Sequence, residues 1–219
     1  MDNTTPQPHE PQETKQPPKG PISNVIRPRF GMSGSVLASK GPNGERYFVS
    51  VLDGEVTAPG QYVQLVDTLY NARKGDVIHI KIFSFGGWVD TGLNIIQAIW
   101  NTQAHVITTA MSTAASIAAV IWLCGHERRV CDGATLMVHM PSGGQSGKTQ
   151  DIADECSQLN DYFAYLLHYI GKDFLTDDEY DRIINRREDT FIPCDEIKRR
   201  LSLLEQAEKQ KEIANVPSD

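Results

Sequence analysis

The stretch VIHIKIFSFGGWVDTGLNIIQAIW, residues 77–100, decides the fold class of this 219-residue chain. Residues 77–83 are rich in β-branched side chains and alternate towards their end, which predicts a strand. The pair Gly86-Gly87 then predicts a tight turn, and apolar residues recur on one side of 90–100, which predicts a helix. A strand that leads through glycines into a helix is one β-α unit of an α/β fold.

The same alternation of strand and helix continues along the chain, without an internal repeat. Strands are predicted at 46–52, 105–110, 128–131 and 135–139, and helices at 61–72, 113–124, 151–170, 177–187 and from 195 to about 213. Breaks are predicted at Asp53-Gly54, Gly75-Asp76 and Asp132-Gly133. We therefore expect an α/β domain with mainly parallel strands.

The ends of the chain differ in composition from its middle. Residues 1–21 hold six of the twelve prolines, so they bury too little apolar surface to offset ordering, and a disordered tail is predicted. The remainder divides into a folded domain at 22–197 and a charged C-terminal helix and tail at 198–219.

Charge and cysteine pattern exclude several classes of protein. The formal net charge of −7 argues against binding to nucleic acid, because few phosphates would be neutralised. The four cysteines form no C-x-x-C pair and lack zinc spacing, so neither a metal site nor a disulfide framework is expected. No apolar run is long enough for a bilayer and no secretory signal is visible. We expect a cytoplasmic protein without cofactor, in the host cytoplasm if the gene is viral.

Two side chains beyond the glycine pair are candidates for chemistry. Ser116 lies in MSTAASIAAVIWLCG, residues 111–125, where small neighbours either pack closely or let a substrate backbone approach a nucleophile. A serine at a helix start also has N–H groups beside it that suit an oxyanion. His139 ends an apolar strand before a loop, a position at which α/β folds place catalytic groups.

A serine–histidine pair also needs an acid that orients the imidazole. The residues alone leave several acids open, of which Asp189 is attractive because it ends a helix and enters an apolar segment. The acids downstream of His139 include Asp151, Asp154, Asp161, Asp173, Asp177, Asp178, Asp181 and Asp189.

Taken in order, these motifs resemble those of the proteolytic subunit of the Clp protease family. Ser84-Phe-Gly-Gly87 is similar to its Ser-Pro-Gly-Gly loop, and Met111-Ser-Thr-Ala-Ala-Ser-Ile-Ala-Ala119 to its nucleophile motif. Met137-Val-His-Met-Pro141 resembles the segment of the general base, and Arg187-Glu-Asp-Thr-Phe-Ile192 the segment of the acid. The gaps of 23 residues from Ser116 to His139 and 50 from His139 to Asp189 are close to those of the family. The resemblance covers about residues 46–197.

The resemblance implies both a fold and roles for residues. The fold is the Clp/crotonase type, stacked β-α-β units with a protruding strand–helix handle at about 141–171. The implied triad is Ser116 as nucleophile, His139 as base and Asp189 as acid, with the backbone N–H groups of Gly87 and Ile117 as oxyanion hole. The implied substrate contacts are Gly86, Trp88, Gly143 and Gly144.

The implied function is a serine endopeptidase for unfolded or small polypeptides, self-compartmentalised in two stacked heptameric rings, a 14-mer, with an AAA+ unfoldase as partner. The C-terminal segment and residues 22–44 depart from the family pattern. In this divergence the chain resembles Clp-like proteins encoded by bacteriophages. Ser112 and Ala118 also stand where the family has glycine.

Three alternatives remain open. The chain is a ring-forming scaffold or regulatory paralogue with a misaligned triad, a crotonase-fold acyl-CoA enzyme, or a Ser–Lys peptidase that uses Lys148 or Lys172 and leaves His139 idle.

Overall fold

The computed structural model describes residues 33–42, 44–143 and 147–214, with side chains described as far as residue 211. The predicted tail at 1–21 and Gly144 lie outside these residues. The strands are β1 Val36–Lys40, β2 Arg46–Val56, β3 Val77–Gly87, β4 His105–Ala115, β5 Glu127–Val130, β6 Thr135–Val138 and β7 Thr190–Pro193. The α-helices are α1 Val63–Asn71, α2 Val89–Asn101, α3 Ile117–Leu123, α4 Thr149–Gly171, α5 Asp177–Tyr180 and α6 Cys194–Ala214, with a 3-10 helix η1 Pro59–Gln61 and a π-helix η2 Asp181–Asn185.

The strands form one mixed sheet in the order β1-β2-β3-β4-β6-β7, with β5 also paired to β4. The pairs β2–β3, β3–β4, β4–β5 and β4–β6 are parallel, and only the outer pairs β1–β2 and β6–β7 are antiparallel among the described residues. The α/β class with mainly parallel strands is therefore confirmed. Because parallel strands end at the same edge, β3, β4 and β6 deliver their last residues to one side of the molecule.

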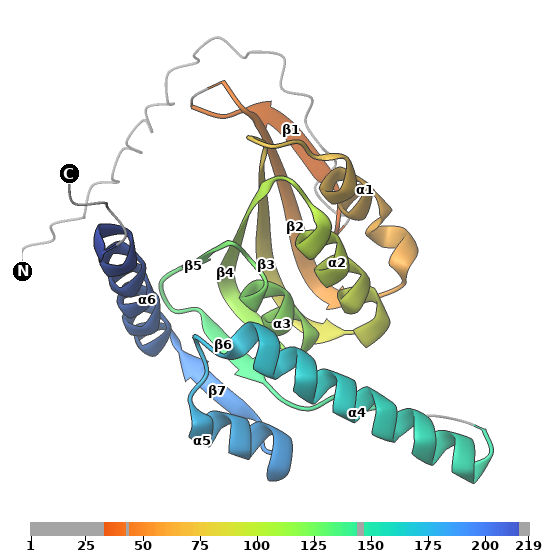
Figure 1. Cartoon of the computed structure of the whole chain (residues 1–219). Helices are drawn as coiled ribbons and strands as arrows, with labels where there is room; N and C mark the ends of the chain where they lie inside the picture. The colour runs from red at the N-terminus through yellow and green to blue at the C-terminus, as the bar shows by residue number, and fades with distance from the viewer. Residues whose placement is uncertain (1–32, 43, 144–146, 215–219) are drawn as a thin grey trace, which may run out of the picture. The chain divides into compact units, whose positions relative to one another are not determined.

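The helices α1, α2 and α3 cover one side of the sheet (Figure 1). Every residue of α3 is buried, in keeping with its wholly apolar sequence IAAVIWL. The Trp122 side chain is 0% exposed and donates its Nε1 hydrogen to the carbonyl of Arg129 at 2.9 Å, so its one polar group is satisfied. The closely packed helix α3 therefore anchors the residue that precedes it, Ser116.

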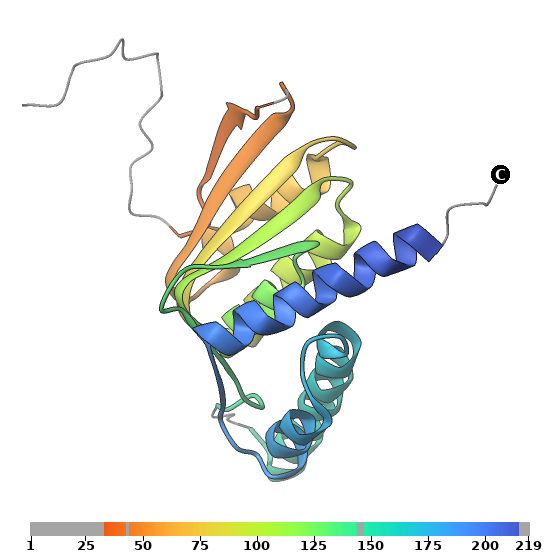
Figure 2. The ribbon, with the colours of Figure 1, turned by 90° about the vertical axis from the view of Figure 1, so that its left-hand side faces the viewer.

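The C-terminal helices cover the other end of the sheet. Helix α4 is 23 residues long and its N-terminal half extends away from the sheet, whereas α6 packs against β5 and β7 (Figures 1 and 2). The buried guanidinium of Arg200 ties α6 to α5 through two hydrogen bonds to Glu179, at 2.7 and 2.8 Å, and donates to the carbonyl of Phe174 at 3.0 Å.

Three expectations about the chain's elements were wrong in detail. Gly86 and Gly87 are not a turn: they end β3 and pair with Glu55 and Val56 of β2. Asp53-Gly54 does not break the chain but lies within β2, where the register shifts.

The region of residues 113–124 is also not one helix, because β4 extends to Ala115 and α3 begins only at Ile117. The small residues 112–115 resemble a helix in composition, yet pairing with β3 and β6 holds them extended.

Candidate active site

Ser116 lies alone between β4 and α3, in a backbone conformation that is rare outside glycine. Its φ is 55° and its ψ −133°, which turns the chain sharply from strand to helix. Its N–H donates to the carbonyl of Met137 at 2.8 Å, and its own carbonyl accepts from Ala119 in the first turn of α3. A non-glycine residue held at positive φ marks a place where the fold accepts strain to aim a side chain. The half-buried hydroxyl is thereby presented at the edge of the sheet.

Two glycines end β3, and the first of them passes directly beside this serine. Gly86 has a φ of +95°, and a Cβ added to it would lie 2.5 Å from Cβ of Ser116. Gly87 has a φ of +145°, and its added Cβ would lie 2.1 Å from the carbonyl oxygen of Val56. The buried hydroxyl of Ser84 accepts from the N–H of Gly86 at 3.1 Å and so fixes this irregular strand end. Only glycine fits at both positions, so backbone groups come close to the nucleophile.

His139 and Asp189 are brought together by the pairing of β6 with β7. Val138, the residue before His139, is the partner of Thr190, the residue after Asp189. Nδ1 of His139 lies 3.7 Å from Oδ1 of Asp189, which is within ion-pair range but longer than a hydrogen bond. The histidine side chain is 19% exposed and that of the aspartate 57% exposed.

The loop that carries Asp189 is itself held in place. Arg187 adopts a φ of 60° and donates from Nη1 to Oδ1 of Asn160 on α4, at 3.0 Å. The N–H of Glu188 donates to the carbonyl of Arg182 at 2.9 Å, and the carboxylate of Glu188 accepts from Nε of Arg182 at 3.0 Å. These contacts fix the loop of Asp189 to α4 and η2. The distance between Asp189 and His139 therefore depends on the positions of α4 and η2.

The predicted site residues thus meet at one edge of the sheet from four separate segments. Gly86 and Gly87 end β3, Ser116 follows β4, His139 follows β6 and Asp189 precedes β7. No hydrogen bond joins Ser116 to His139 in the part of the chain that the structure describes.

The other predicted site residues surround this edge. Trp88 is the N-terminal flanking residue of α2, Ile117 begins the buried α3, and Gly143 is exposed in the loop after β6. Lys148 and Lys172 flank the two ends of α4.

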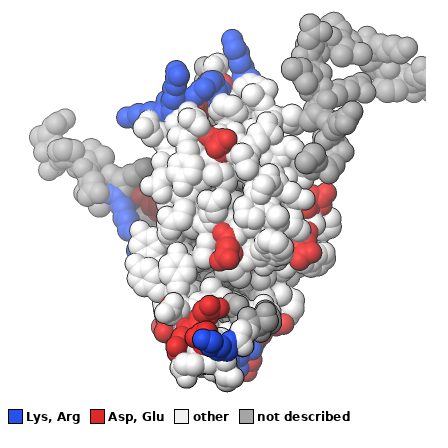
Figure 3. Space-filling model, turned by 90° about the vertical axis from the view of Figure 1, so that its right-hand side faces the viewer, with Lys and Arg blue, Asp and Glu red and all other residues white. Residues whose placement is uncertain are grey.

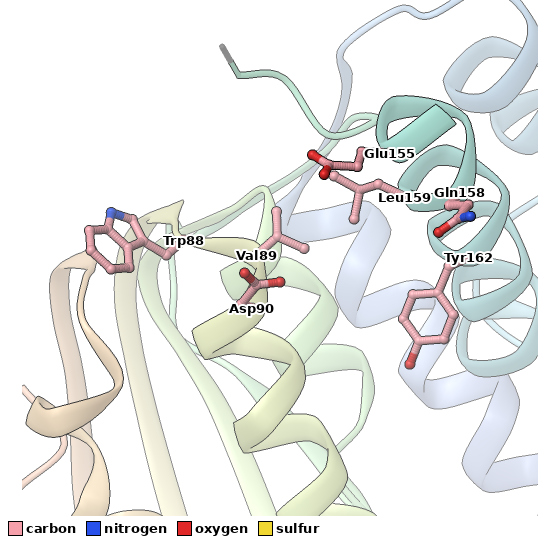
Figure 4. Close-up of a pocket in the computed structure, with 7 residues that line it drawn as sticks. All are labelled: Trp88, Val89, Asp90, Glu155, Gln158, Leu159 and Tyr162. Carbon is pink, nitrogen blue, oxygen red and sulfur yellow. The ribbon is translucent and has the colours of Figure 1, made fainter. Parts of the chain in front are cut away.

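A cavity of about 500 Å³ separates the start of α2 from α4, next to this edge (Figure 4). The sequence did not predict this cavity, because half of its wall comes from a helix that follows more than sixty residues later. The sequence did include Ser84 in the motif Ser-Phe-Gly-Gly, but nothing in the sequence indicates the hydrogen bond that its hydroxyl accepts from Gly86. The lining residues are Trp88, Val89, Asp90, Glu155, Gln158, Leu159 and Tyr162.

Comparison with known proteins bears directly on this geometry. A model of the family described as Clp protease matches residues 55–199, a range that contains Gly87, Ser116, His139 and Asp189. The chain belongs to the Clp protease family. The predicted family and the α/β fold class are therefore confirmed, and membership of the Clp protease family supports a serine peptidase function.

Two relatives show how far the sequence of this chain has diverged from other members of the Clp protease family. The chain is 28% identical over 129 residues to an ATP-dependent Clp protease proteolytic subunit of Chlamydomonas reinhardtii, covering 58% of this chain and 24% of that protein. It is 27% identical over 155 residues to the ATP-dependent Clp protease proteolytic subunit 1 of Frankia casuarinae, covering 63% of this chain and 72% of that protein.

Among the described residues, no helix combines the length and the apolar character that crossing a bilayer requires.

Proposed function

We propose that this chain is a serine endopeptidase that cleaves unfolded or small polypeptides with Ser116, His139 and Asp189. One observation carries the proposal: the register of β4, β6 and β7 places a strained serine, a histidine and a histidine-paired carboxylate at one edge of the sheet. The three groups of the proposed triad come from three separate segments, and the pairing of β6 with both β4 and β7 brings these segments together.

In the proposed mechanism each group has its own role. Oγ of Ser116 attacks the scissile carbonyl, and Nε2 of His139 accepts the hydroxyl proton and later donates it to the leaving amine. Asp189, on the Nδ1 side of the same ring, selects the tautomer that leaves Nε2 free and stabilises the imidazolium. The N–H groups of Gly87 and Ile117 receive the negative charge that develops on the carbonyl oxygen.

Extended polypeptide is the substrate that fits the surroundings of the triad. Gly86 adjoins Ser116, Trp88 follows the end of β3, and Gly143 is exposed in the loop after β6; these three residues and Gly144 are the proposed substrate contacts. A substrate strand that pairs with such backbone gains affinity from main-chain hydrogen bonds, which are independent of sequence. Unfolded segments and short peptides meet this requirement, whereas folded domains do not.

Assembly is the second part of the proposal. The relatives in Chlamydomonas and Frankia are named subunits of an ATP-dependent protease. We propose by analogy that this chain forms two stacked heptameric rings, encloses its active sites, and receives substrates from an AAA+ unfoldase. Cytoplasmic location and bacteriophage origin stay predictions.

The experiment is hydrolysis of a denatured, fluorescence-quenched protein by the assembled wild type and its variants. Ser116→Ala should lower the rate by at least about a thousandfold, as in other serine triads. Ser112→Ala, four residues earlier and exposed at the end of β4, serves as the matched control and should retain activity. Equal activity of Ser116→Ala and wild type would contradict the proposal. Loss of activity in Lys148→Ala, with activity kept in His139→Ala, would replace the triad by a Ser–Lys pair.

A ring-forming scaffold is the second candidate, and one observation favours it. Among the described residues the triad lacks the Ser116–His139 hydrogen bond, and the 3.7 Å separation to Asp189 is long. A native-mass measurement that shows an intact ring, together with no hydrolysis by wild type, would support this candidate. A crotonase-type acyl-CoA reaction has no observation in its favour.

A further inference from the structure

The cavity between α2 and α4 opens directly beside the proposed nucleophile. Trp88 and Val89 in its wall follow Gly87 without a gap, and Gly86 touches Ser116. Helix α2 is pressed onto the residue after the serine, since a Cβ added to Gly92 would lie 2.0 Å from Cγ1 of Ile117. The cavity therefore begins next to the strand end that adjoins the proposed nucleophile, within reach of a substrate side chain near the scissile carbonyl.

A second, smaller cavity of about 130 Å³ continues the first towards the histidine. It shares Val89 and Leu159 with the larger cavity and adds Pro141, two residues after His139, and Gly143. Its wall also contains Cys156, whose side chain is exposed on α4. The two cavities thus adjoin at Val89 and Leu159, between the residues that follow Gly87 and those that follow His139.

The wall of the larger cavity combines apolar and acidic groups. Val89 and Leu159 point into the space between the two helices in Figure 4, and the ring of Tyr162 lies on the α4 side. Asp90 on α2 and Glu155 on α4 supply two carboxylates, and no lysine or arginine lines the cavity. Neither carboxylate takes part in any hydrogen bond or ion pair formed by the described residues.

The surface around the larger cavity is mainly acidic, and Arg187 donates to Asn160 in the wall of the smaller cavity. Asp151, Asp154 and Glu155 follow one another along the exposed N-terminal half of α4. Figure 3 shows acidic side chains gathered at this lower end of the face with basic side chains among them, and a second group of lysines and arginines at the opposite end. A cation entering the cavity is therefore attracted, and an anion repelled.

Resting on the proposed function, we propose that this cavity selects substrates with a lysine or arginine on the residue that supplies the scissile carbonyl. The methylene stem of such a side chain covers Val89 and Leu159, and its charged end reaches the two unpaired carboxylates. The ring of Tyr162 on the α4 side of the cavity adds attraction for a cation. A carboxylate side chain would meet like charge, and an aliphatic one would gain no attraction from Asp90 and Glu155, which are exposed to solvent.

The test compares two quenched peptides that differ at one position, lysine against norleucine, which has the same stem without the ammonium. Wild type should cleave the lysine peptide with about a tenfold higher kcat/KM, the value of roughly two partly exposed ion pairs. In the double variant Asp90→Asn, Glu155→Gln the ratio should fall towards one. Asp151→Asn, an exposed acid of α4 outside the cavity wall, is the matched control and should keep the ratio. Equal cleavage of both peptides by wild type would overturn the proposal.

A second measurement does not depend on catalysis. In a Cys131→Ser, Cys194→Ser background, Cys156 is the exposed thiol, and its reaction with a cationic and an anionic methanethiosulfonate reports the charge at the cavity. We expect the cationic reagent to react several-fold faster, and the preference to fall in the double variant. No preference would overturn the inference whether or not peptides are cleaved. A preference without any cleavage would leave the cation site standing and contradict the peptidase.

Discussion

Replacing Gly86 with alanine tests how closely β3 passes the nucleophile. The added Cβ would lie 2.5 Å from Cβ of Ser116 and 2.8 Å from the carbonyl oxygen of Ala115. Neither atom is the free end of a flexible side chain. The backbone of Ser116 is held by its hydrogen bond to Met137 and by the buried helix α3, so the serine cannot give way without disturbing both.

Two separate costs follow from this geometry. Alanine at a φ of +95° costs on the order of 1–2 kcal/mol for its backbone conformation alone. The contact adds a second cost, because carbon atoms normally rest about 3.5–4.0 Å apart, so the serine must move by roughly 1 Å. A misplacement of about 1 Å at a reacting group costs on the order of a hundredfold in rate.

Gly75→Ala separates the two costs, since Gly75 has nearly the same φ, +92°, and nothing within 4 Å of its added Cβ. The assay is thermal unfolding together with the rate of labelling by a fluorophosphonate probe. Both variants should lose about 1–2 kcal/mol of stability from the backbone. Gly86→Ala should lose more and label about a hundredfold more slowly, while Gly75→Ala labels like wild type. A folded Gly86→Ala that labels at the wild-type rate would refute the reasoning.

Three further predictions concern the acid, a buried histidine and a buried ion pair. Asp189→Asn should lower kcat by up to about ten-thousandfold without unfolding the chain, measured by peptide hydrolysis; an unchanged kcat would remove this acid from the triad. Burial, with the nearby charges of lysine and arginine, lowers the pKa of His79 to about 4. Above about pH 6.5 the His79 ring is neutral in both the folded and the unfolded chain. As the pH falls from about 6.5 to about 4, only the unfolded chain binds a proton at this ring, so the free energy of unfolding should fall by up to ~3 kcal/mol. Urea unfolding across this range should show a flatter loss for His79→Gln; identical slopes would contradict the assignment. Arg200→Met leaves the buried carboxylate of Glu179 unpaired and should cost about 3–5 kcal/mol in urea unfolding, while Arg199→Met, an exposed neighbour, should cost less than about 1 kcal/mol. Equal losses would show that burial of the first pair does not matter.

Much of the fold could be predicted from the sequence because most elements are periodic and separated by turn residues. The elements that were missed or misplaced have little pattern of their own. Residues 111–115 are mostly small and resemble the helix that follows, but β4 continues through them because β3 and β6 supply hydrogen-bonding partners on both sides. Strand β7 has four residues and exists through its pairing with β6.

The candidate site likewise has a part that local sequence predicts and a part that only the tertiary structure brings together. Ser116 and His139 could be nominated from local context, whereas the acid could not be chosen among eight aspartates without a resemblance. The pairing of Val138 with Thr190, fifty-two residues apart, is what places Asp189 beside the histidine. The positive φ of Ser116 and the cavity wall on α4 are tertiary properties that no local pattern encodes.

The most direct test of the central claim is to label the wild-type chain with a fluorophosphonate and to locate the modified residue by peptide mass spectrometry. We expect a single modified peptide that contains Ser116, and no labelling of Ser116→Ala or His139→Ala. Labelling at another serine, or undiminished labelling of Ser116→Ala, would contradict the account.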